Sequence, residues 1–123
     1  METPPHVLIV EDNEHVTSAL RILLESAEWR VSVADSIGAA LESARIDPPA
    51  VALLDLTLPD GDGLLLAEPL RAAGTKKIVV LTGHDDRETT QRCTEAGCDD
   101  VLIKPVSIRD LLEKSRAWAS ALE

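Results

Sequence analysis

Short apolar runs that each end at a polar residue constrain the fold of this chain more than any other feature. The runs are Val7–Val10, Val51–Leu54, Ile78–Leu81 and Val101–Ile103. Runs of this length, bounded by turn residues and separated by stretches of helical periodicity, are typical of parallel strands covered on both faces. A further segment, Trp29–Ala34, alternates apolar and polar residues and therefore predicts a half-exposed edge strand.

Segments with helical periodicity lie between these strands. We expect helices over Asn13–Ala27, Ser36–Arg45, Gly63–Ala73, Asp86–Ala96 and Ser107–Leu122. Strand–helix alternation with short connections favours right-handed crossovers and helices on both faces of one open sheet. The expected fold class is therefore α/β, a doubly wound five-stranded parallel sheet of flavodoxin-like order 2-1-3-4-5.

Three local expectations refine this picture. The segment Leu56–Gly63 is rich in turn residues and predicts a loop without strands. Pro69 lies inside the expected third helix, where proline removes an intrahelical hydrogen bond, so we expect a kink or a late helix start. In the last helix, helical spacing predicts a core face made of Ile108, Leu111, Leu112, Ser115, Ala119 and Leu122.

Length, charge and hydropathy narrow the class of protein. The 123 residues suit a single domain over residues 1–123, with residues 1–5 as a frayed lead-in and no output domain. The net charge of −10 disfavours direct nucleic-acid binding. No stretch has the length of a membrane span or the pattern of a secretory signal, so we expect a cytoplasmic protein. Cys93 and Cys98 match no metal or disulfide pattern and are expected to be reduced thiols.

Polar residues at the ends of the strands are predicted to meet at one edge of the sheet. Glu11 and Asp12 follow the first strand, Asp55 the third, Thr82 the fourth and Lys104 the fifth. In such sheets, ligands bind beyond the carboxyl ends of the strands, at the point where the strand order reverses. Neighbouring carboxylates repel one another unless a cation intervenes, and hard oxygen ligands suit Mg²⁺. The sequence therefore predicts a magnesium site with a hydroxyl and an ammonium group beside it.

These groups suit phosphoryl transfer. That reaction requires an in-line nucleophile and positive charge against the phosphoryl oxygens. The carboxylate of Asp55 can serve as the nucleophile and form an acyl phosphate. Lys104 offers a compact positive charge, and the hydroxyl of Thr82 can donate to another phosphoryl oxygen.

The same residues resemble the receiver domain of two-component response regulators, over essentially the whole chain. The matching positions are the acidic pair Glu11–Asp12, the phosphoacceptor Asp55, the loop residues Pro59 and Gly63, the hydroxyl residue Thr82 and the lysine–proline pair Lys104–Pro105. All of them stand in register, at the ends of predicted strands or in the loop after the third strand. The resemblance is therefore more specific than any one of these residues taken alone.

The resemblance implies that a histidine kinase or histidine phosphotransfer protein donates a phosphoryl group to Asp55. It implies direct Mg²⁺ ligation by Asp12, Asp55 and the backbone carbonyl of Thr57, with Glu11 acting largely through water. Thr57 and His84 occupy positions that tune the lifetime of the phosphoryl group in the family. Such a domain is a regulatory phosphoacceptor rather than an enzyme, and its output passes to a downstream protein that the sequence does not identify. Pairing of two copies through the last two helices, as in many relatives, stays open.

The chain departs from the family at one position. The family usually has tyrosine or phenylalanine three residues before the lysine, whereas Val101 stands here and the chain contains no Tyr or Phe. We therefore hypothesise that phosphorylation reaches the fourth helix and the fifth strand through Thr82 and its loop alone, with a smaller conformational response.

Two other functions remain open from the sequence. A receiver-like interaction module would bind partners without phosphorylation. An aspartyl-phosphate-type phosphatase would use a second aspartate two residues after Asp55, where this chain has Thr57. Taken singly, Asp12 and Asp55 could be solvated strand-end residues, and Lys104 could be an ion-pair partner of Asp55.

Outside this edge, the remaining histidines and tryptophans receive ordinary interpretations. We expect His6, His15 and His84 on the surface, because none has a second histidine or a cysteine at metal-ligand spacing. Trp29 and Trp118 are expected to be packing residues, with Trp118 either covering the core edge or standing partly exposed. On the first helix, His15, Ala19 and Ile22 form a strip beside the core stripe, which we interpret as a candidate docking surface for a kinase.

Overall fold

The computed structural model describes residues 3–123. Of the frayed lead-in expected over residues 1–5, residues 1 and 2 lie outside this range. The carbonyl oxygen of Pro5 already accepts a hydrogen bond from the backbone N–H of Arg30, at 2.9 Å. The chain is therefore fixed to the sheet one residue before its first strand begins.

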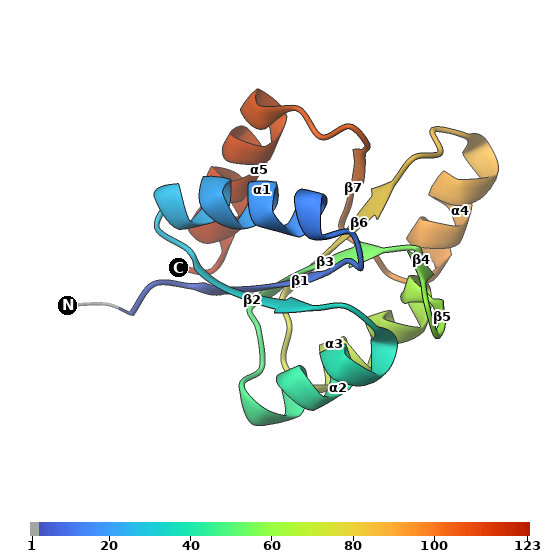
Figure 1. Ribbon diagram of the computed structural model, residues 1–123, viewed down its shortest axis with the longest axis horizontal. Helices are drawn as coiled ribbons and strands as arrows, with labels where there is room; N and C mark the ends of the chain where they lie inside the picture. The colour runs from blue at the N-terminus through green and yellow to red at the C-terminus, as the bar shows by residue number, and fades with distance from the viewer. Residues whose placement is uncertain (1–2) are drawn as a thin grey trace.

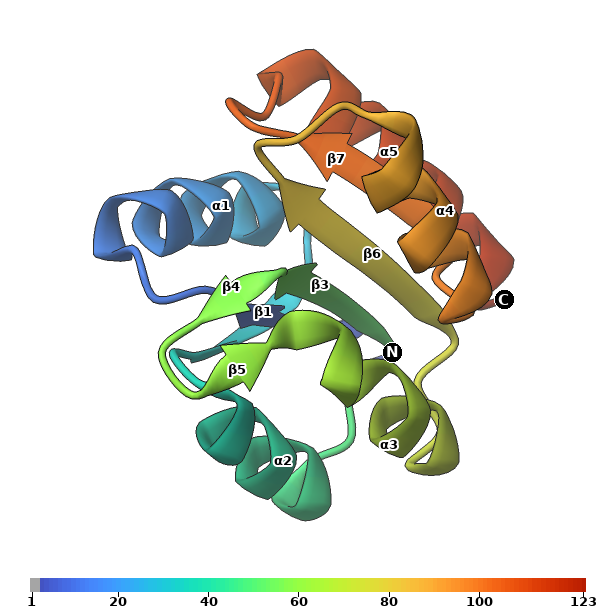
Figure 2. The ribbon, with the colours of Figure 1, turned by 90° about the vertical axis from the view of Figure 1, so that its right-hand side faces the viewer.

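One parallel sheet forms the centre of the molecule (Figure 1). Its strands, in spatial order, are β2 (Arg30–Ala34), β1 (His6–Val10), β3 (Val51–Asp55), β6 (Lys77–Thr82) and β7 (Asp100–Ile103). Figure 2 shows β3 and β6 side by side and pointing the same way, as their parallel register requires. This order confirms the expected 2-1-3-4-5 arrangement, with β2 as an edge strand and β1 and β3 inside the sheet.

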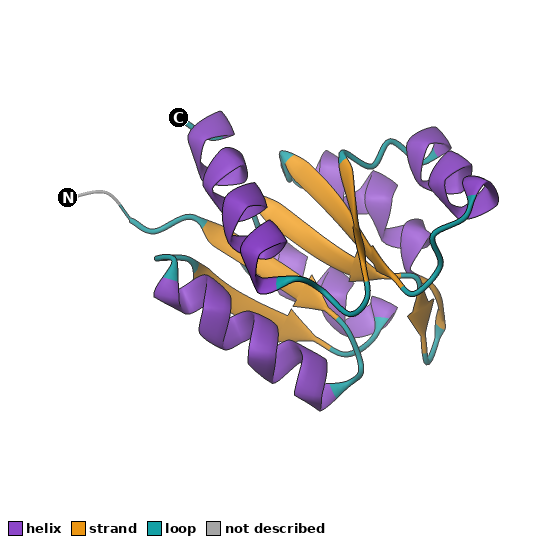
Figure 3. Cartoon of the chain, turned by 90° about the horizontal axis from the view of Figure 1, so that it is seen from above, coloured by secondary structure: helices purple, strands orange, loops and turns teal. Residues whose placement is uncertain are grey.

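Helices cover both faces of this sheet. They are α1 (Glu14–Ser26), α2 (Ile37–Ile46), α3 (Ala67–Ala72), α4 (Arg87–Glu95) and α5 (Ile108–Ala121). Figures 1 and 3 show α1 and α5 on one face and α2 and α3 on the other. Side-chain oxygens accept hydrogen bonds from backbone N–H groups at the starts of four helices, where those groups lack helical partners. The capping residues are Asn13, Ser36, Asp86 and Ser107.

The apolar runs make two cores, one on each face of the sheet. Every residue of β1 and β3 is buried, and successive side chains point to opposite faces. On the α1 and α5 face, the central strands contribute Val7, Ile9, Val51 and Leu53. On the α2 and α3 face, they contribute Leu8, Val10, Ala52 and Leu54. Burial of each large aliphatic side chain contributes roughly 1.5–3 kcal/mol, so these two strands are firmly held in the fold.

Both tryptophans are packing residues, as expected. Trp29 and Trp118 are each 4% exposed and belong to the core between the sheet and the helices α1 and α5. The alternative of a partly exposed Trp118 is therefore wrong. Cys93 is buried within α4, Cys98 lies just beyond that helix, and both are free thiols.

The connection after β3 contradicts the expectation of a loop without strands. Thr57–Leu58 forms β4 and Gly61–Asp62 forms β5, and they pair antiparallel around a two-residue turn, Pro59-Asp60. Gly61 has φ 144°, a backbone conformation that glycine adopts without the steric cost of a Cβ. Turn residues dominate this segment because the hairpin is so short. The two residue pairs between β4 and β5 could therefore not be predicted from the sequence.

The late start of the third helix is confirmed. A 3₁₀ turn, η1 (Gly63–Leu66), precedes α3, which begins only at Ala67. Pro69 then lies in the first turn of α3, where its missing N–H is tolerated. Gly74 and Gly97 follow the ends of α3 and α4 with φ of 108° and 84°, a backbone conformation typical of glycine at a helix C-terminus.

Two burial expectations are wrong. Ile108 is 60% exposed, because it is the first residue of α5 and the core face of that helix is instead made by Leu111, Ser115 and Trp118. His6 is only 4% exposed, because it begins the interior strand β1 and pairs in register with Arg30 of β2. None of the helices described over residues 3–123 is both long and apolar enough to cross a membrane.

Buried His6 should make the stability of the fold depend on pH. Its Nε2 lies 2.7 Å from Oγ of Ser32. Its Nδ1 lies 3.7 Å from a carboxylate oxygen of Asp47, and this nitrogen has no hydrogen-bond partner among residues 3–123. Burial, followed by the charge of Arg30, lowers the pKa of His6, while Asp47 opposes the change. The unfolded chain therefore binds a proton more readily than the folded one as pH falls below about 6.5.

We predict that the contribution of His6 to the free energy of unfolding, measured with urea, falls between pH 7.5 and pH 5.5, so that the parent chain loses more stability than His6→Gln over this interval. The variant His15→Gln, at an exposed position of α1, serves as the control and should behave as the parent chain does. An equal loss of stability in the parent and in His6→Gln would contradict the prediction.

Candidate functional site

The carboxyl ends of the strands bring the predicted polar residues into one open pocket. Glu11 and Asp12 directly follow β1, Asp55 ends β3, Thr82 ends β6 and Lys104 directly follows β7. The pocket has a volume of about 620 Å³. It is lined by Glu11, Asp12, Asn13, Asp55, Leu56, Thr57, Thr82, Gly83, His84 and Lys104. Every residue that the sequence analysis named as a candidate phosphoryl or metal contact therefore lines the same pocket.

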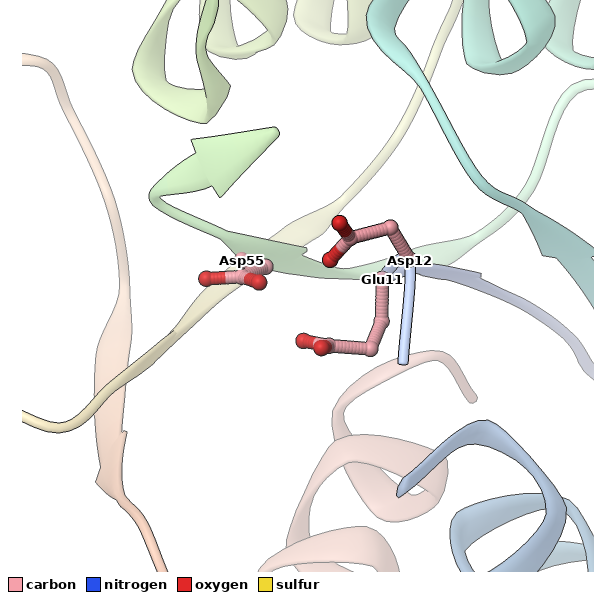
Figure 4. A group of neighbouring side chains, drawn as sticks. All are labelled: Glu11, Asp12 and Asp55. Carbon is pink, nitrogen blue, oxygen red and sulfur yellow. The ribbon is translucent and has the colours of Figure 1, made fainter. Parts of the chain in front are cut away.

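The carboxylates form the acidic centre of this pocket. One oxygen from each of Glu11, Asp12 and Asp55 lies within 4.8 Å of the others. Figure 4 shows Glu11 and Asp12 at the end of β1 and Asp55 at the end of β3, with the side chains of Glu11 and Asp12 pointing toward Asp55. Glu11 is 2% exposed and Asp55 7% exposed, whereas Asp12 is open to solvent. An ion could therefore reach the cluster from the side of Asp12.

Lys104 supplies the positive charge beside this cluster. Its Nζ donates a hydrogen bond to Oε2 of Glu11 at 2.9 Å and lies 3.4 Å from Oδ2 of Asp55. The ion pair with Asp55 was anticipated from the sequence. The shorter contact with Glu11 was not, because nothing in the local sequence connects two residues 93 positions apart.

Together, burial and the neighbouring charges raise the pKa of both Glu11 and Lys104, which favours the neutral form of the acid and the charged form of the base. Burial raises the pKa of Glu11, the hydrogen bond from Lys104 opposes this effect, and the nearby Asp55 adds to it. For Lys104, burial alone would lower the pKa, but the hydrogen bond to Glu11 and the charge of Asp55 outweigh burial, and the net pKa is raised. Lys104 therefore stays a cation in its ordinary range of pH.

A helix cap fixes the backbone that carries Glu11 and Asp12. The side-chain oxygen of Asn13 accepts hydrogen bonds from the N–H groups of His15, at 2.9 Å, and Val16, at 3.3 Å. The N–H of Asn13 in turn donates to Oε1 of Glu11 at 3.3 Å. Sequence analysis placed Asn13 at the helix start but missed its part in orienting Glu11. An asparagine between an acidic pair and a helix was the available signal.

Backbone N–H groups orient the other two strand-end side chains. The N–H of Thr57 donates to Oδ1 of Asp55 at 3.1 Å, which leaves Oδ2 facing Lys104. The N–H of His84 donates to Oγ1 of Thr82 at 3.0 Å, so the hydroxyl proton of Thr82 is not used in that bond. The side chains of His15 and His84 are exposed, as expected.

Gly63 packs against the backbone of Asp55. A Cβ at this position would lie 1.9 Å from the backbone oxygen of Asp55, far inside van der Waals contact. The N–H of Gly63 also donates to the carbonyl oxygen of Leu56 at 3.0 Å. The start of η1 therefore packs directly on the backbone that carries Asp55, and only glycine fits there.

We predict that Gly63→Ala lowers the free energy of unfolding by about 3 kcal/mol, because the added methyl group must displace backbone rather than a flexible side chain. The matched control is Gly83→Ala, where an added Cβ would meet nothing within 4 Å. That control should change stability by less than about 1 kcal/mol. Urea unfolding of both variants checks the prediction, and equal stability of the two would refute it.

Comparison with known proteins identifies the family. Residues 7–116 match the family described as the response regulator receiver domain. The chain is 34% identical over 111 residues to the transcriptional regulatory protein KdpE of Mycobacterium tuberculosis, covering 90% of this chain and 49% of that protein. It is 35% identical over 111 residues to the KDP operon transcriptional regulatory protein KdpE of Escherichia coli K12, with the same coverage. The chain belongs to the receiver domain family of two-component response regulators, whose members are regulatory phosphoacceptor domains.

The chain spans about half the length of these curated relatives. Among solved structures, a two-component response regulator from Clostridium difficile superposes with a TM-score of 0.91 at 24% identity, covering 97% of this chain and 98% of that one. The receiver domain of the sensor histidine kinase PA1611 from Pseudomonas aeruginosa superposes with a TM-score of 0.81 at 27% identity, covering 94% and 97%. That structure has a magnesium ion coordinated in its active-site cleft. The receiver fold is thus established for this chain.

Proposed function

We propose that Asp55 accepts a phosphoryl group from a phosphohistidine of a histidine kinase or a histidine phosphotransfer protein. The observation that carries this proposal is the meeting of Asp55 with Glu11, Asp12, Thr82 and Lys104 in one pocket, although they come from distant parts of the chain. Membership of the receiver family supports it independently. The chain then acts as a phosphorylation switch and not as an enzyme on an external substrate.

The donor set fits a magnesium ion. All the converging ligand atoms are carboxylate oxygens, the hard donors that Mg²⁺ prefers, and Asp12 leaves the cluster open on one side for water and phosphoryl oxygens. Asp12, Asp55 and the backbone carbonyl of Thr57 would hold the ion directly, and Glu11 would act through water. When bound, the ion supplies positive charge against the phosphoryl oxygens. The magnesium site of the PA1611 receiver domain supports this assignment.

The transfer step requires no proton from Asp55. An oxygen of its carboxylate attacks phosphorus, the new O–P bond forms as the P–N bond of phosphohistidine breaks, and the electron pair of that bond stays on the imidazole nitrogen. The Thr57 N–H holds the other oxygen of Asp55 at 3.1 Å. The nucleophile is therefore already oriented before the donor arrives.

Lys104 and Thr82 are placed to hold the transferred group. The ammonium of Lys104 lies 3.4 Å from Oδ2 of Asp55 and so stands beside the bond that would form. Thr82 receives the N–H of His84 on its oxygen and can donate its own proton to a phosphoryl oxygen. Each group thus contributes positive charge or a hydrogen bond where negative charge accumulates.

Intact mass after incubation with acetyl phosphate and Mg²⁺ tests the central assignment. We expect one added phosphoryl group on the parent chain and none on Asp55→Asn, because the uncharged amide oxygen is a poor nucleophile compared with a carboxylate. Asp35→Asn is the control, since Asp35 is an exposed carboxylate at the end of the neighbouring strand β2 and lies outside the cluster. An adduct that persists in Asp55→Asn would reject Asp55 as the acceptor. An unmodified parent chain would favour the phosphorylation-independent module.

The exposed strip of α1 is the proposed docking surface for the donor. His15, Ala19 and Ile22 are all solvent-exposed, and the side chain of Ile22 is 67% exposed. Their helix starts directly beside the acidic pair, so a donor seated on it is close to the pocket. We further propose that residues 1–123 act as a single receiver unit in the cytoplasm and that output passes through contact with a downstream protein.

We predict that Ile22→Glu slows phosphotransfer from a phosphorylated histidine phosphotransfer domain about tenfold, because a charge would be buried in the contact. The control is Ile46→Glu on α2, where the isoleucine is 70% exposed but lies away from the strip. Phosphorylation by acetyl phosphate should be equal in both variants, since that donor requires no protein contact. Equal transfer rates for the two variants would reject the docking surface.

A further inference from the structure

Helix α4 is the least anchored helix of the domain. Cys93 is its only buried residue, and apart from half-buried Thr89 its other residues are exposed. An element with so little buried surface can change position at low cost. The orientation of α4 therefore depends strongly on the few specific contacts that it makes.

The β4–β5 hairpin is, in contrast, attached to the phosphoacceptor. The N–H of Thr57 holds Oδ1 of Asp55, and Thr57 pairs with Asp62 across the hairpin. Gly63, the next residue after Asp62, packs on the backbone oxygen of Asp55 without room for a Cβ. A displacement of Asp55 or of the Thr57 backbone must therefore move Asp62 as well.

One side chain joins the hairpin to the helix. The guanidinium of Arg92 on α4 forms an ion pair with Oδ2 of Asp62, while Oδ1 of Asp62 accepts the N–H of Leu64 at 2.9 Å. Figure 1 shows α4 and the hairpin at the same end of the molecule. Asp62 thus connects the backbone beside Asp55 with the loosely packed α4.

We propose that the Asp62–Arg92 ion pair couples occupancy of the acidic pocket to the position of α4. The inference rests on the function proposed above and adds a second route for its signal, beside the Thr82 loop that the sequence analysis expected to act alone. Val101 is too small to act as a bulky relay, and the loop after Thr82 enters α4 only at its N-terminal end. The ion pair instead acts on the C-terminal half of α4, one residue before its buried anchor, Cys93. Arg92 is a positioning residue and takes no part in the transfer step.

The exposure of the pair limits the size of this effect. The side chains of Arg92 and Asp62 are 46% and 40% exposed, so solvent screens their attraction. An ion pair of this kind can change a conformational equilibrium by at most about fivefold. A change of this size can shift the position of a helix that has one buried side chain, and a spectroscopic measurement can detect it.

Amide chemical shifts with and without Mg²⁺ and beryllofluoride, an analogue of the acyl phosphate, test the proposal. In the parent chain we expect shifts both in the hairpin, residues 57–63, and in α4, residues 88–95. Arg92→Gln should keep the hairpin shifts and lose at least half of the α4 shifts. Asp62→Asn, which retains the oxygen that caps η1, should give the same loss, and the double variant should lose no more than either single variant.

The control is Arg87→Gln, an exposed arginine on α4 for which no ion pair is formed within residues 3–123. It should respond as the parent chain does. If α4 responds fully in Arg92→Gln, the coupling through the ion pair is refuted while the proposed function stands. If the parent chain shows no shifts in the hairpin and gains no phosphoryl mass, the function proposed for Asp55 fails, and this inference fails with it.

Discussion

The structure depends on one constraint, the repulsion among neighbouring carboxylates. Strands that cannot move apart hold these carboxylates together. β1 and β3 are buried along their whole length, so Glu11 and Asp55 cannot separate without disrupting both cores. Lys104 is the one cation described within 4 Å of these carboxylates in residues 3–123. When Glu11, Asp12 and Asp55 are all ionised, two negative charges remain uncompensated. Burial raises the pKa of Glu11 and the nearby Asp55 adds to this effect, and binding of a divalent cation would relieve the repulsion between the carboxylates.

Sequence analysis predicted the sheet and its polar edge because both follow from burial. A run such as Val51–Leu54 can be apolar at every position only if helices cover both faces, and parallel strands then place their ends at one edge. The polar residue at each strand end is thereby assigned to the pocket without knowledge of any contact. What this reasoning cannot supply is the direction of a flexible side chain. The Lys104–Glu11 contact joins residues 93 positions apart and became apparent only in three dimensions.

The features that were missed have tertiary causes. The β4–β5 hairpin is too short for a period-two pattern, and it is held from outside by Asp60, whose carboxylate accepts the N–H groups of Ile37 and Gly38 at 2.8 and 3.0 Å. Likewise, His6 looks like a polar residue before a strand, but its neighbours Arg30 and Asp47 are supplied by other elements. In both cases a polar residue has its partners elsewhere in the chain, where local propensity cannot indicate them.

The fold therefore has a rigid part, the buried strands that carry the acidic pocket, and a more mobile part that can change position when the pocket is occupied. The acidic pocket is built on the fully buried strands, so occupancy by an ion or a phosphoryl group cannot be absorbed by the sheet. The element that can move at the lowest cost is α4, whose one buried residue is Cys93. The coupling proposed above involves no large aromatic relay at position 101. In that proposal, the hairpin attached to Asp55 and joined to α4 by one ion pair makes the connection.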